Sequence, residues 1–328
     1  MLAFVQRVAF NRLMLGAAAA GSLAACSASP DPAPQKAPLG AAPSFDDARS
    51  RIAASIARDA ADPRIERAAL PRLYDHGKRV ERAVLLLHGF TNCPQQFDEL
   101  ARMLHARGAN VYVPRLPLHG HKNRLTRALA NLTVTDLVRC AQETYGDARG
   151  LGETVAVLGL SLGGTMALWL AQTQPVDVAV PIAPFLMPIA IPQWFGNIAM
   201  RALDAIPDMY WWWDPRIKAA SLPPYAYPGF PTHALAKIVF LGDVVLKEAH
   251  RVAPLARKCT FVINANESAV NDSVTAGLFA RWKQYGARYH YDILRDLGEP
   301  RHDIIDPTTF PQARALVYPT LERLALTS

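Results

Sequence analysis

Short apolar runs alternate with segments of helical periodicity over most of the chain. Continuous apolar runs lie at residues 82–87, 110–113, 155–158, 176–181 and 258–265. Runs of this kind are typical of buried parallel strands. Apolar residues recur at helical spacing between them, at 95–107, 133–145 and 165–172. This alternation predicts βαβ units and a mostly parallel sheet flanked by helices, which is the α/β fold class.

The last part of the chain continues the pattern. A loop at 266–272 precedes a predicted helix at 274–285 and an alternating strand at 288–294. A polar loop follows at 298–303, and the residues 310–324 have the periodicity of one closing helix. The sequence therefore places two polar loops after the last two predicted strands.

Residues 1–25 have the pattern of a secretory leader, with Arg7 and Arg12 before an apolar stretch too short for a comfortable membrane span. The leader ends in Leu23-Ala-Ala-Cys26 and resembles the bacterial lipobox, which implies that Cys26 carries palmitate and other acyl chains and becomes the new N-terminus. Ser27, where an Asp would mark inner-membrane retention, favours the outer membrane of the cell envelope. The alternative is an ordinary secretory signal with a coincidental cysteine.

The residues after the leader predict a tether and then one domain. Residues 26–43 are rich in Ala, Pro and Ser, which predicts a flexible tether. The folded part, 44–328, is expected to begin with a helix capped by Ser44 in the pattern Ser44-x-x-Asp47. This length suits one large domain with an insertion better than two small ones.

Charge and cysteine content narrow the function classes. The chain has 328 residues and a formal charge of +7, which becomes +5 without the two leader arginines. Its Lys and Arg are scattered, so nucleic-acid binding is not expected. Cys93, Cys140 and Cys259 cannot all pair with one another, and their disulfide state stays open, as does the oligomeric state. No Cys/His spacing suggests a metal.

The apolar run at 155–158 ends in Gly159-Leu-Ser161-Leu-Gly163, and helix-forming residues follow. Strand, sharp turn and helix in this order predict a nucleophile elbow, in which Ser161 is held on a strained turn with its hydroxyl exposed to substrate. An ordinary glycine-rich turn with a helix-capping serine is the alternative. Because Ser161 occupies the nucleophile position, Cys93 is not expected to act as one.

A serine nucleophile requires a base, an acid and oxyanion donors. His302 lies in the loop after the final strand and is the candidate base. Glu267 leaves the preceding strand more directly than Asp272, which favours Glu267 as the acid, with Asp272 kept as the alternative or as a helix cap. The backbone N–H groups of Phe90 and Leu162 are the candidate oxyanion donors.

These segments together resemble α/β-hydrolases of the carboxylesterase and monoacylglycerol-lipase type. The resemblance rests on Leu87-His-Gly-Phe-Thr91, Pro114-Arg-Leu-Pro-Leu-His-Gly120, the Ser161 motif and the late His302, and it covers residues 80–325. The family's acid turn, Gly-x-x-Asp-x-x-Val, appears at 264–270 with Asn for Gly and Glu267 for Asp. The resemblance implies an α/β-hydrolase fold, a serine esterase that needs no cofactor, and an ester or lipid substrate. The proline loop, with His119, is interpreted as architecture.

The span 181–231 contains ten prolines and many aromatic residues, so regular sheet is not expected there. In hydrolases a cap is inserted at this point, and we expect one at about 185–250 with helical pieces at 198–205 and 234–249. The three tryptophans at 211–213 are interpreted as a roof over an apolar acyl pocket. Two alternatives are that they anchor the cap to the sheet, or that they meet lipid.

The favoured hypothesis is a lipid-anchored serine carboxylesterase or lipase that works through an acyl-enzyme. A second hypothesis is a catalytically silent envelope binding or scaffold protein on the same fold. A third is a peptidase or thioesterase with the same triad.

Overall fold

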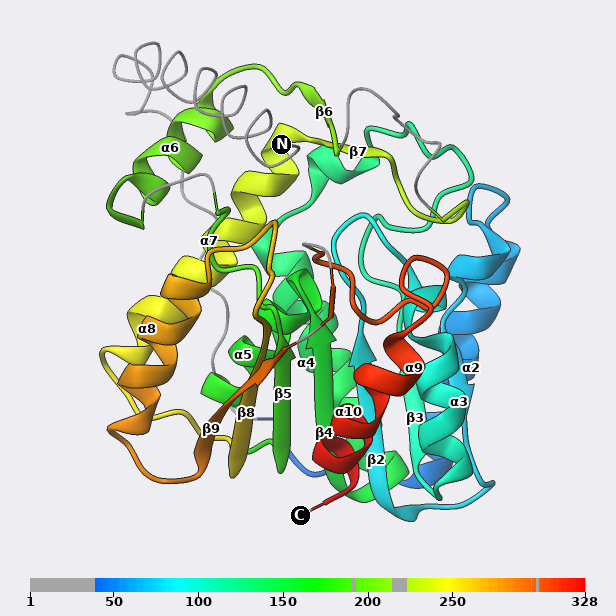
Figure 1. The fold of residues 1–328 in the computed structure, drawn as a ribbon. Helices are drawn as coiled ribbons and strands as arrows, with labels where there is room; N and C mark the ends of the chain where they lie inside the picture. Colours follow the sequence, from blue (N-terminus) through cyan, green and yellow to red (C-terminus); the bar gives the residue numbers. More distant parts are fainter. Residues whose placement is uncertain (1–38, 190–192, 214–222, 296, 299–300, 328) are drawn as a thin grey trace.

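The computed structural model describes residues 39–189, 193–213, 223–295, 297–298 and 301–327 (Figure 1). The predicted leader, Cys26 and most of the tether lie outside the described residues, as do two stretches within the predicted cap, 190–192 and 214–222. No helix in the described part of the chain combines the length and the apolar character needed to cross a membrane.

A seven-stranded sheet forms the centre of the molecule, in the order β1-β3-β2-β4-β5-β8-β9. Its strands are β1 (Arg72–Tyr74), β2 (Val80–Leu87), β3 (Asn110–Val113), β4 (Gly152–Leu160), β5 (Val178–Ile182), β8 (Lys258–Asn264) and β9 (Tyr289–Leu294). Only β1 pairs antiparallel, with β3, and the remaining pairs in this sheet are parallel. The mostly parallel sheet predicted from the apolar runs is therefore confirmed, with a short antiparallel edge strand added.

Helices cover both faces of this sheet (Figure 1). The α-helices are α2 (Phe45–Ala61), α3 (Asp98–Ala106), α4 (Val134–Leu151), α5 (Leu162–Thr173), α6 (Gln193–Ala205), α7 (Thr232–Ala249), α8 (Asp272–Lys283), α9 (Ala313–Leu316) and α10 (Tyr318–Leu326). Short 3₁₀ turns are η1 (Arg67–Ala69), η2 (Pro94–Phe97) and η3 (Ala128–Asn131). Right-handed crossovers place α3 on the face opposite α4 and α5, because the chain runs in opposite directions across the sheet.

Local sequence signals set the starts of two long helices. Ser44 caps α2 as predicted, its hydroxyl accepting a hydrogen bond from the Asp47 amide at 3.1 Å. Thr133 and Asp136 form a reciprocal capping box at the start of α4. Each such cap is worth about 1 kcal/mol, because it satisfies N–H groups that have no partner within the helix.

The core lies between the sheet and its helices, and it sets the level of the strand ends. All the residues from Ala83 to Leu87 in β2 are buried, as are those from Val155 to Leu160 in β4. In the register of these two strands Leu87 pairs with Gly159. The loop after β2 and the turn after β4 therefore begin side by side at the carboxyl edge of the sheet, where Figure 1 also shows α6, β6 and β7.

Two sequence predictions about local structure are wrong. The proline-rich span contains a two-stranded antiparallel sheet, β6 (Tyr210–Trp212) with β7 (Gly229–Pro231). Proline is tolerated there because a two-stranded sheet has only edge strands, and Pro231 lies at a strand end. The predicted closing helix is divided at Val317 into α9 and α10, since Pro319 removes an N–H that an unbroken helix would need.

Candidate active site

Ser161 sits on a strained turn between β4 and α5, as predicted for a nucleophile elbow. Its φ is 57° and its ψ is −114°, a conformation that costs a non-glycine residue about 1–3 kcal/mol. Backbone bonds hold it there: the Ser161 amide donates to Ile182 O at 2.9 Å, and Ser161 O accepts from the Phe185 amide at 3.1 Å. The side-chain position is therefore set by the fold.

The glycines of the motif are required by close backbone contacts. A Cβ at Gly159 would lie 2.1 Å from Gly163 O, and a Cβ at Gly163 would lie 2.0 Å from Leu87 O. The second contact shows that the elbow packs directly against the end of β2. Ser161 thus lies beside the loop that carries Phe90.

His302 and Glu267 are brought together from different loops. Glu267 lies in the turn after β8, and His302 lies in the loop after β9; the His302 Nδ1 and Glu267 Oε1 atoms are 2.9 Å apart. Glu267 Oε1 also accepts from the amides of Ser268 and Ala269, each at 2.7 Å. The carboxylate is thereby fixed, with its side chain only 2% exposed.

This contact shifts the pKa values of both groups. Burial lowers the pKa of the His302 ring, but the charge and hydrogen bond of Glu267, together with the charges of Asp303 and Asp272, outweigh it, and the net pKa lies above the usual value. Burial raises the pKa of Glu267, whereas the charge and hydrogen bond of His302 and the amides of Ala269 and Ser268 lower it further than burial raises it. The pair is therefore stabilised as imidazolium and carboxylate.

Asp272, the alternative acid, occupies a different position. It is the first residue of α8, whose cap is Asn271, so the interpretation of Asp272 as the cap is wrong. Burial, followed by the negative charge of Glu267, raises the pKa of Asp272 to about 6. Its Oδ1 atom is buried and has no hydrogen-bond partner among the described residues. Of the two candidate acids, Glu267 is the one whose hydrogen bond to His302 the structure contains.

The loop after β2 carries Phe90 at its tip and is held by the predicted cap region. Thr91 has a positive φ of 62°. Its hydroxyl accepts a hydrogen bond from Trp213 Nε1 at 2.8 Å, and its carbonyl accepts one from the Tyr227 amide at 2.8 Å. Phe90 packs against Phe230, with ring centroids 5.2 Å apart. The other candidate donor, Leu162, is the first residue of α5, where backbone N–H groups lack an intrahelical partner.

The three neighbouring tryptophans have different surroundings. Trp213 contacts the Phe90 loop, Trp211 pairs with Phe230 in the small sheet, and Trp212 packs edge-on against Tyr210. Trp213 therefore ties this region to the loop after β2 at the carboxyl edge of the sheet, as expected if the tryptophans anchor the predicted cap to the sheet.

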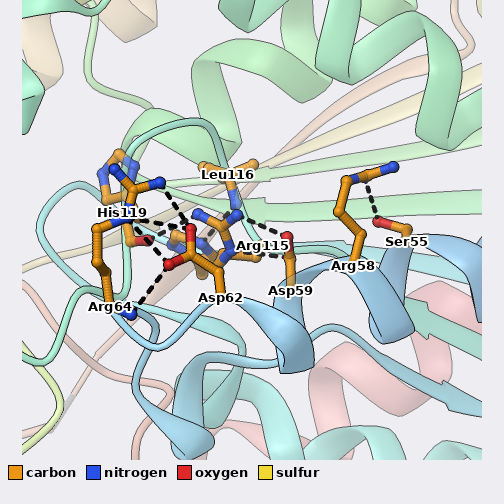
Figure 2. Close-up of polar contacts among 9 residues, drawn as sticks. Ser55, Arg58, Asp59, Asp62, Arg64, Arg115, Leu116 and His119 are labelled. Atoms are coloured by element: carbon orange, nitrogen blue, oxygen red, sulfur yellow. Dashed lines mark hydrogen bonds and ion pairs between the residues drawn. The ribbon is translucent and has the colours of Figure 1, made fainter.

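The proline loop is tied to α2 and to the loop after β2. Arg115 donates to both oxygens of Asp59 at 2.8 Å and to the His119 carbonyl at 2.9 Å (Figure 2). His88 Nε2 accepts from the Leu116 amide at 3.0 Å. Burial lowers the pKa of His119 to about 4, so its ring is neutral at neutral pH. These contacts agree with an architectural role for this loop.

The side chains of Gln96 and Asp303 connect the loop after β2 with the loop that carries His302. The sequence does not single out either of them as functional. Gln96 Oε1 accepts from the Gly89 amide at 2.8 Å, and Gln96 Nε2 donates to Asp303 Oδ2 at 2.7 Å. Asp303 directly follows His302, and this adjacency makes it a poor candidate for the acid. No motif marks Gln96, because a glutamine in a helical stretch carries no signal of a distant partner.

The three described cysteines are free thiols. Burial raises the pKa of the Cys93 thiol to about 12, which keeps it protonated and a poor nucleophile. Within the described ranges, no cluster of three or more His, Cys, Asp and Glu side chains is arranged to hold a metal ion.

Known proteins resemble this chain in sequence. Residues 84–321 match the profile of the alpha/beta hydrolase family. A thermostable monoacylglycerol lipase of Bacillus sp. (strain H-257) is 34% identical over 163 residues, which cover 48% of this chain and 60% of that protein. A carboxylesterase of Bacillus subtilis (strain 168) is 34% identical over 103 residues, which cover 31% of this chain and 41% of that protein. Both matches span less than two thirds of the relative's length.

Solved structures resemble it in fold. A Paleococcus ferrophilus monoacylglycerol lipase aligns with a TM-score of 0.56 and 16% identity, over 77% of this chain and 97% of that one. A soluble variant of the Saccharomyces cerevisiae monoglyceride lipase aligns with a TM-score of 0.59 and 12% identity, over 79% of this chain and 92% of that one. At these identities the likeness concerns the fold alone. Given the span of the profile match and the sheet described above, the chain belongs to the alpha/beta hydrolase family.

Proposed function

We propose that the protein is a serine carboxylesterase or lipase that hydrolyses carboxylic esters with an apolar acyl group through an acyl-enzyme. The observation that carries this proposal is the 2.9 Å contact between His302 Nδ1 and Glu267 Oε1 at the edge of the sheet where the Ser161 elbow lies. With Nδ1 bound to the carboxylate, Nε2 is left to act as the base. Lipase and esterase relatives in the same family support ester hydrolysis as the reaction.

The proposed reaction has two halves. Ser161 Oγ attacks the ester carbonyl while His302 Nε2 takes the hydroxyl proton, and the oxyanion accepts hydrogen bonds from the amides of Phe90 and Leu162. The tetrahedral intermediate collapses, its C–O bond to the alcohol breaks, and His302 returns the proton to the leaving alcohol. Water then attacks the acyl-enzyme by the same route, which releases the acid and regenerates Ser161. Glu267 orients the imidazole and stabilises its charged form.

The surroundings of Phe90 favour an apolar acyl group. Phe90, Trp213 and Phe230 form an aromatic cluster, with the Trp213 and Phe230 ring centroids 4.6 Å apart. Such side chains favour alkyl chains over charged peptides. This is why an ester is proposed ahead of a peptide.

The test is hydrolysis of p-nitrophenyl esters of two, eight and sixteen acyl carbons by the full chain in detergent, with Ser161→Ala as the matched control. We expect turnover by the wild type and its loss in Ser161→Ala, together with labelling of Ser161 by a fluorophosphonate. Wild-type protein that is folded but neither turns over nor labels would favour a silent scaffold. Labelling with preference for thioesters or peptides would favour the third hypothesis.

We further propose that Cys26 carries the lipid that anchors the chain in the bacterial outer membrane. The support is the leader pattern and the sequence Leu23-Ala-Ala-Cys26 followed by Ser27. Several acyl chains give firm anchoring without a spanning helix. Labelled palmitate should enter the wild type and not Cys26→Ser, and membrane fractionation should recover the wild type with outer-membrane markers. Palmitate in neither protein would refute the lipid anchor.

A further inference from the structure

The Gly89 amide, the Gln96 side chain and the Asp303 carboxylate form a continuous hydrogen-bonded bridge, here called the Gln96 bridge. Its two bonds measure 2.8 and 2.7 Å. Gln96 is only 2% exposed, and Asp303 is partly buried. A Cβ placed on Gly89 would lie 3.5 Å from Gln96 Oε1, so the amide is packed against the backbone of the loop after β2.

Hydrogen bonding fixes the orientation of both side chains. The Gly89 amide is a donor, so the Gln96 oxygen must face it and the Gln96 nitrogen must face Asp303. Asp303 Oδ1 accepts from the amides of Ile305 and Asp306 at 3.1 and 3.2 Å, which directs Oδ2 to Gln96. Asn92 Nδ2 adds a longer contact to the same Oδ2 at 3.4 Å.

The ends of the Gln96 bridge lie one residue from the proposed chemistry. Gly89 precedes Phe90, the proposed oxyanion donor, and Asp303 follows His302, the proposed base. The two loops are far apart in sequence, since 207 positions separate Gln96 from Asp303. Because neighbouring residues share a peptide plane, a displacement of either anchor moves the adjacent group.

We propose that Gln96 and Asp303 are positioning residues that hold the Phe90 amide and the His302 ring in register with each other for ester hydrolysis. This proposal rests on the proposed function and adds to it the device that aligns its two loops. Neither residue touches the reacting atoms in this proposal.

The test exchanges donor and acceptor across the Gln96 bridge. In Asp303→Asn, Oδ1 keeps the two amide bonds, and the new NH₂ group opposes Gln96 Nε2, donor against donor. In Gln96→Glu, two carboxylates face each other. In the double variant, one oxygen of the new carboxylate at position 96 accepts from the Gly89 amide, and the other accepts from the new NH₂ group at position 303. The hydrogen-bond pattern and the formal charge of the pair are thereby restored.

We expect each single variant to lower kcat about tenfold or more, because misplacement by 1 Å can cost about a hundredfold. KM should change less than about twofold, since neither residue belongs to the aromatic cluster of Phe90, Trp213 and Phe230 that is proposed to favour the acyl group. The double variant should recover kcat to within about threefold of wild type, the remainder reflecting the lost Asn92 contact. In Asp303→Asn, the acid limb of kcat/KM should move to lower pH, because the charge of Asp303 helps to raise the pKa of His302.

The controls make the same exchanges elsewhere. Gln284 is the C-cap residue of α8, and Asp292 forms a partly exposed ion pair with Arg323. The variants Gln284→Glu and Asp292→Asn should leave kcat unchanged. Gln96→Met removes both hydrogen bonds at similar volume and serves as the probe if a single variant fails to fold; it should lower kcat without changing KM. Fluorophosphonate labelling of Ser161 should slow in parallel with kcat.

Outcomes for the Gln96 bridge and for the proposed function are separable. If the wild type hydrolyses esters and folded single variants match it, or if the double variant stays as slow as the singles, the Gln96 bridge does not position the site although the esterase function stands. If the wild type itself neither hydrolyses esters nor labels at Ser161, the function fails, and the positioning role fails with it.

Discussion

Replacing Glu267 with glutamine should isolate the charge of the carboxylate from its orienting role. Glu267 Oε1 accepts from His302 Nδ1 and three backbone amides, whereas Oε2 is buried without a hydrogen-bond partner among the described residues. Four donors converge on one atom, so in Glu267→Gln the new carbonyl oxygen will take the Oε1 position and the new NH₂ group the Oε2 position. His302 then keeps its tautomer and its hydrogen bond, and only the charge is lost.

The size of this loss follows from the contact. Two unit charges about 4 Å apart attract by about 4 kcal/mol at an effective dielectric constant of about 20. The neutral hydrogen bond that remains returns about 1 kcal/mol. A net loss of about 3 kcal/mol in stabilising the imidazolium corresponds to about a 10²-fold fall in kcat. Glu267→Ala also removes the orientation and should cost about 10⁴-fold.

The assay is the pH profile of kcat/KM for a p-nitrophenyl ester in wild type, Glu267→Gln, Glu267→Ala and Asp272→Asn. His302 must be neutral to act as base, and the Glu267 charge raises its pKa. The plateau in Glu267→Gln should therefore fall while its acid limb moves to lower pH. Asp272→Asn removes a nearby carboxylate that makes no hydrogen bond to His302 in the described part of the chain, so it should change the plateau of kcat/KM less than about threefold. A larger loss in Asp272→Asn than in Glu267→Gln would refute the assignment of the acid.

Three further predictions concern stability, each measured by thermal or chemical unfolding. Gly163→Ala should cost at least about 3 kcal/mol of unfolding free energy, because its Cβ would lie 2.0 Å from Leu87 O; an unchanged melting temperature would contradict the packing of the elbow. Gly277→Ala, in the exposed part of α8 with nothing within 4 Å of the new Cβ, should gain about 1 kcal/mol, and a loss would contradict that open surrounding. Burial and the Glu267 charge raise the pKa of Asp272 to about 6, so the folded state loses stability as the pH rises from the unfolded pKa of this carboxyl to about 6, and the loss persists above pH 6. Asp272→Asn should therefore melt higher than wild type above pH 6 and equally below about pH 4, and a constant difference across this range would show that titration is not the cause.

The sequence predicted the parts of the fold that depend on local pattern. The apolar runs predicted the strands β2 to β5 and β8, because nearly every residue of a strand buried on both faces is apolar. It missed β1, since three residues of an edge strand have no periodicity to detect. It also missed the break at Val317, because the apolar spacing continues across Pro319 and hides it.

The candidate site was predictable where one residue type at one position defines the role. Ser161 and His302 follow from motif and loop order, and the structure places Ser161 directly after β4 and His302 in the loop after β9; their catalytic roles stay predictions. The choice between Glu267 and Asp272 stayed open because it depends on the course of a turn rather than on residue type. Gln96 was missed for a related reason: its partner, Asp303, is remote in sequence, and a glutamine–aspartate pair is common on any surface.

The relation of the predicted cap region to the candidate site follows from one strained residue. Thr91 is held at a positive φ, which costs a β-branched side chain about 1–2 kcal/mol and requires compensating contacts. Within the loop, the Thr91 hydroxyl donates to Phe90 O at 2.6 Å. Two further contacts come from the predicted cap region, through Trp213 to the Thr91 hydroxyl and through the Tyr227 amide to the Thr91 carbonyl, each at 2.8 Å. Gln96 accepts a hydrogen bond from the same loop at the Gly89 amide. Phe90 is thus flanked in sequence by two anchored residues, Thr91 bound to the predicted cap region and Gly89 linked through Gln96 to the His302 loop, so the direction of its amide depends on tertiary contacts in addition to the loop's own hydrogen bonds. It follows that residues grafted from this loop alone onto another hydrolase would not reproduce its geometry.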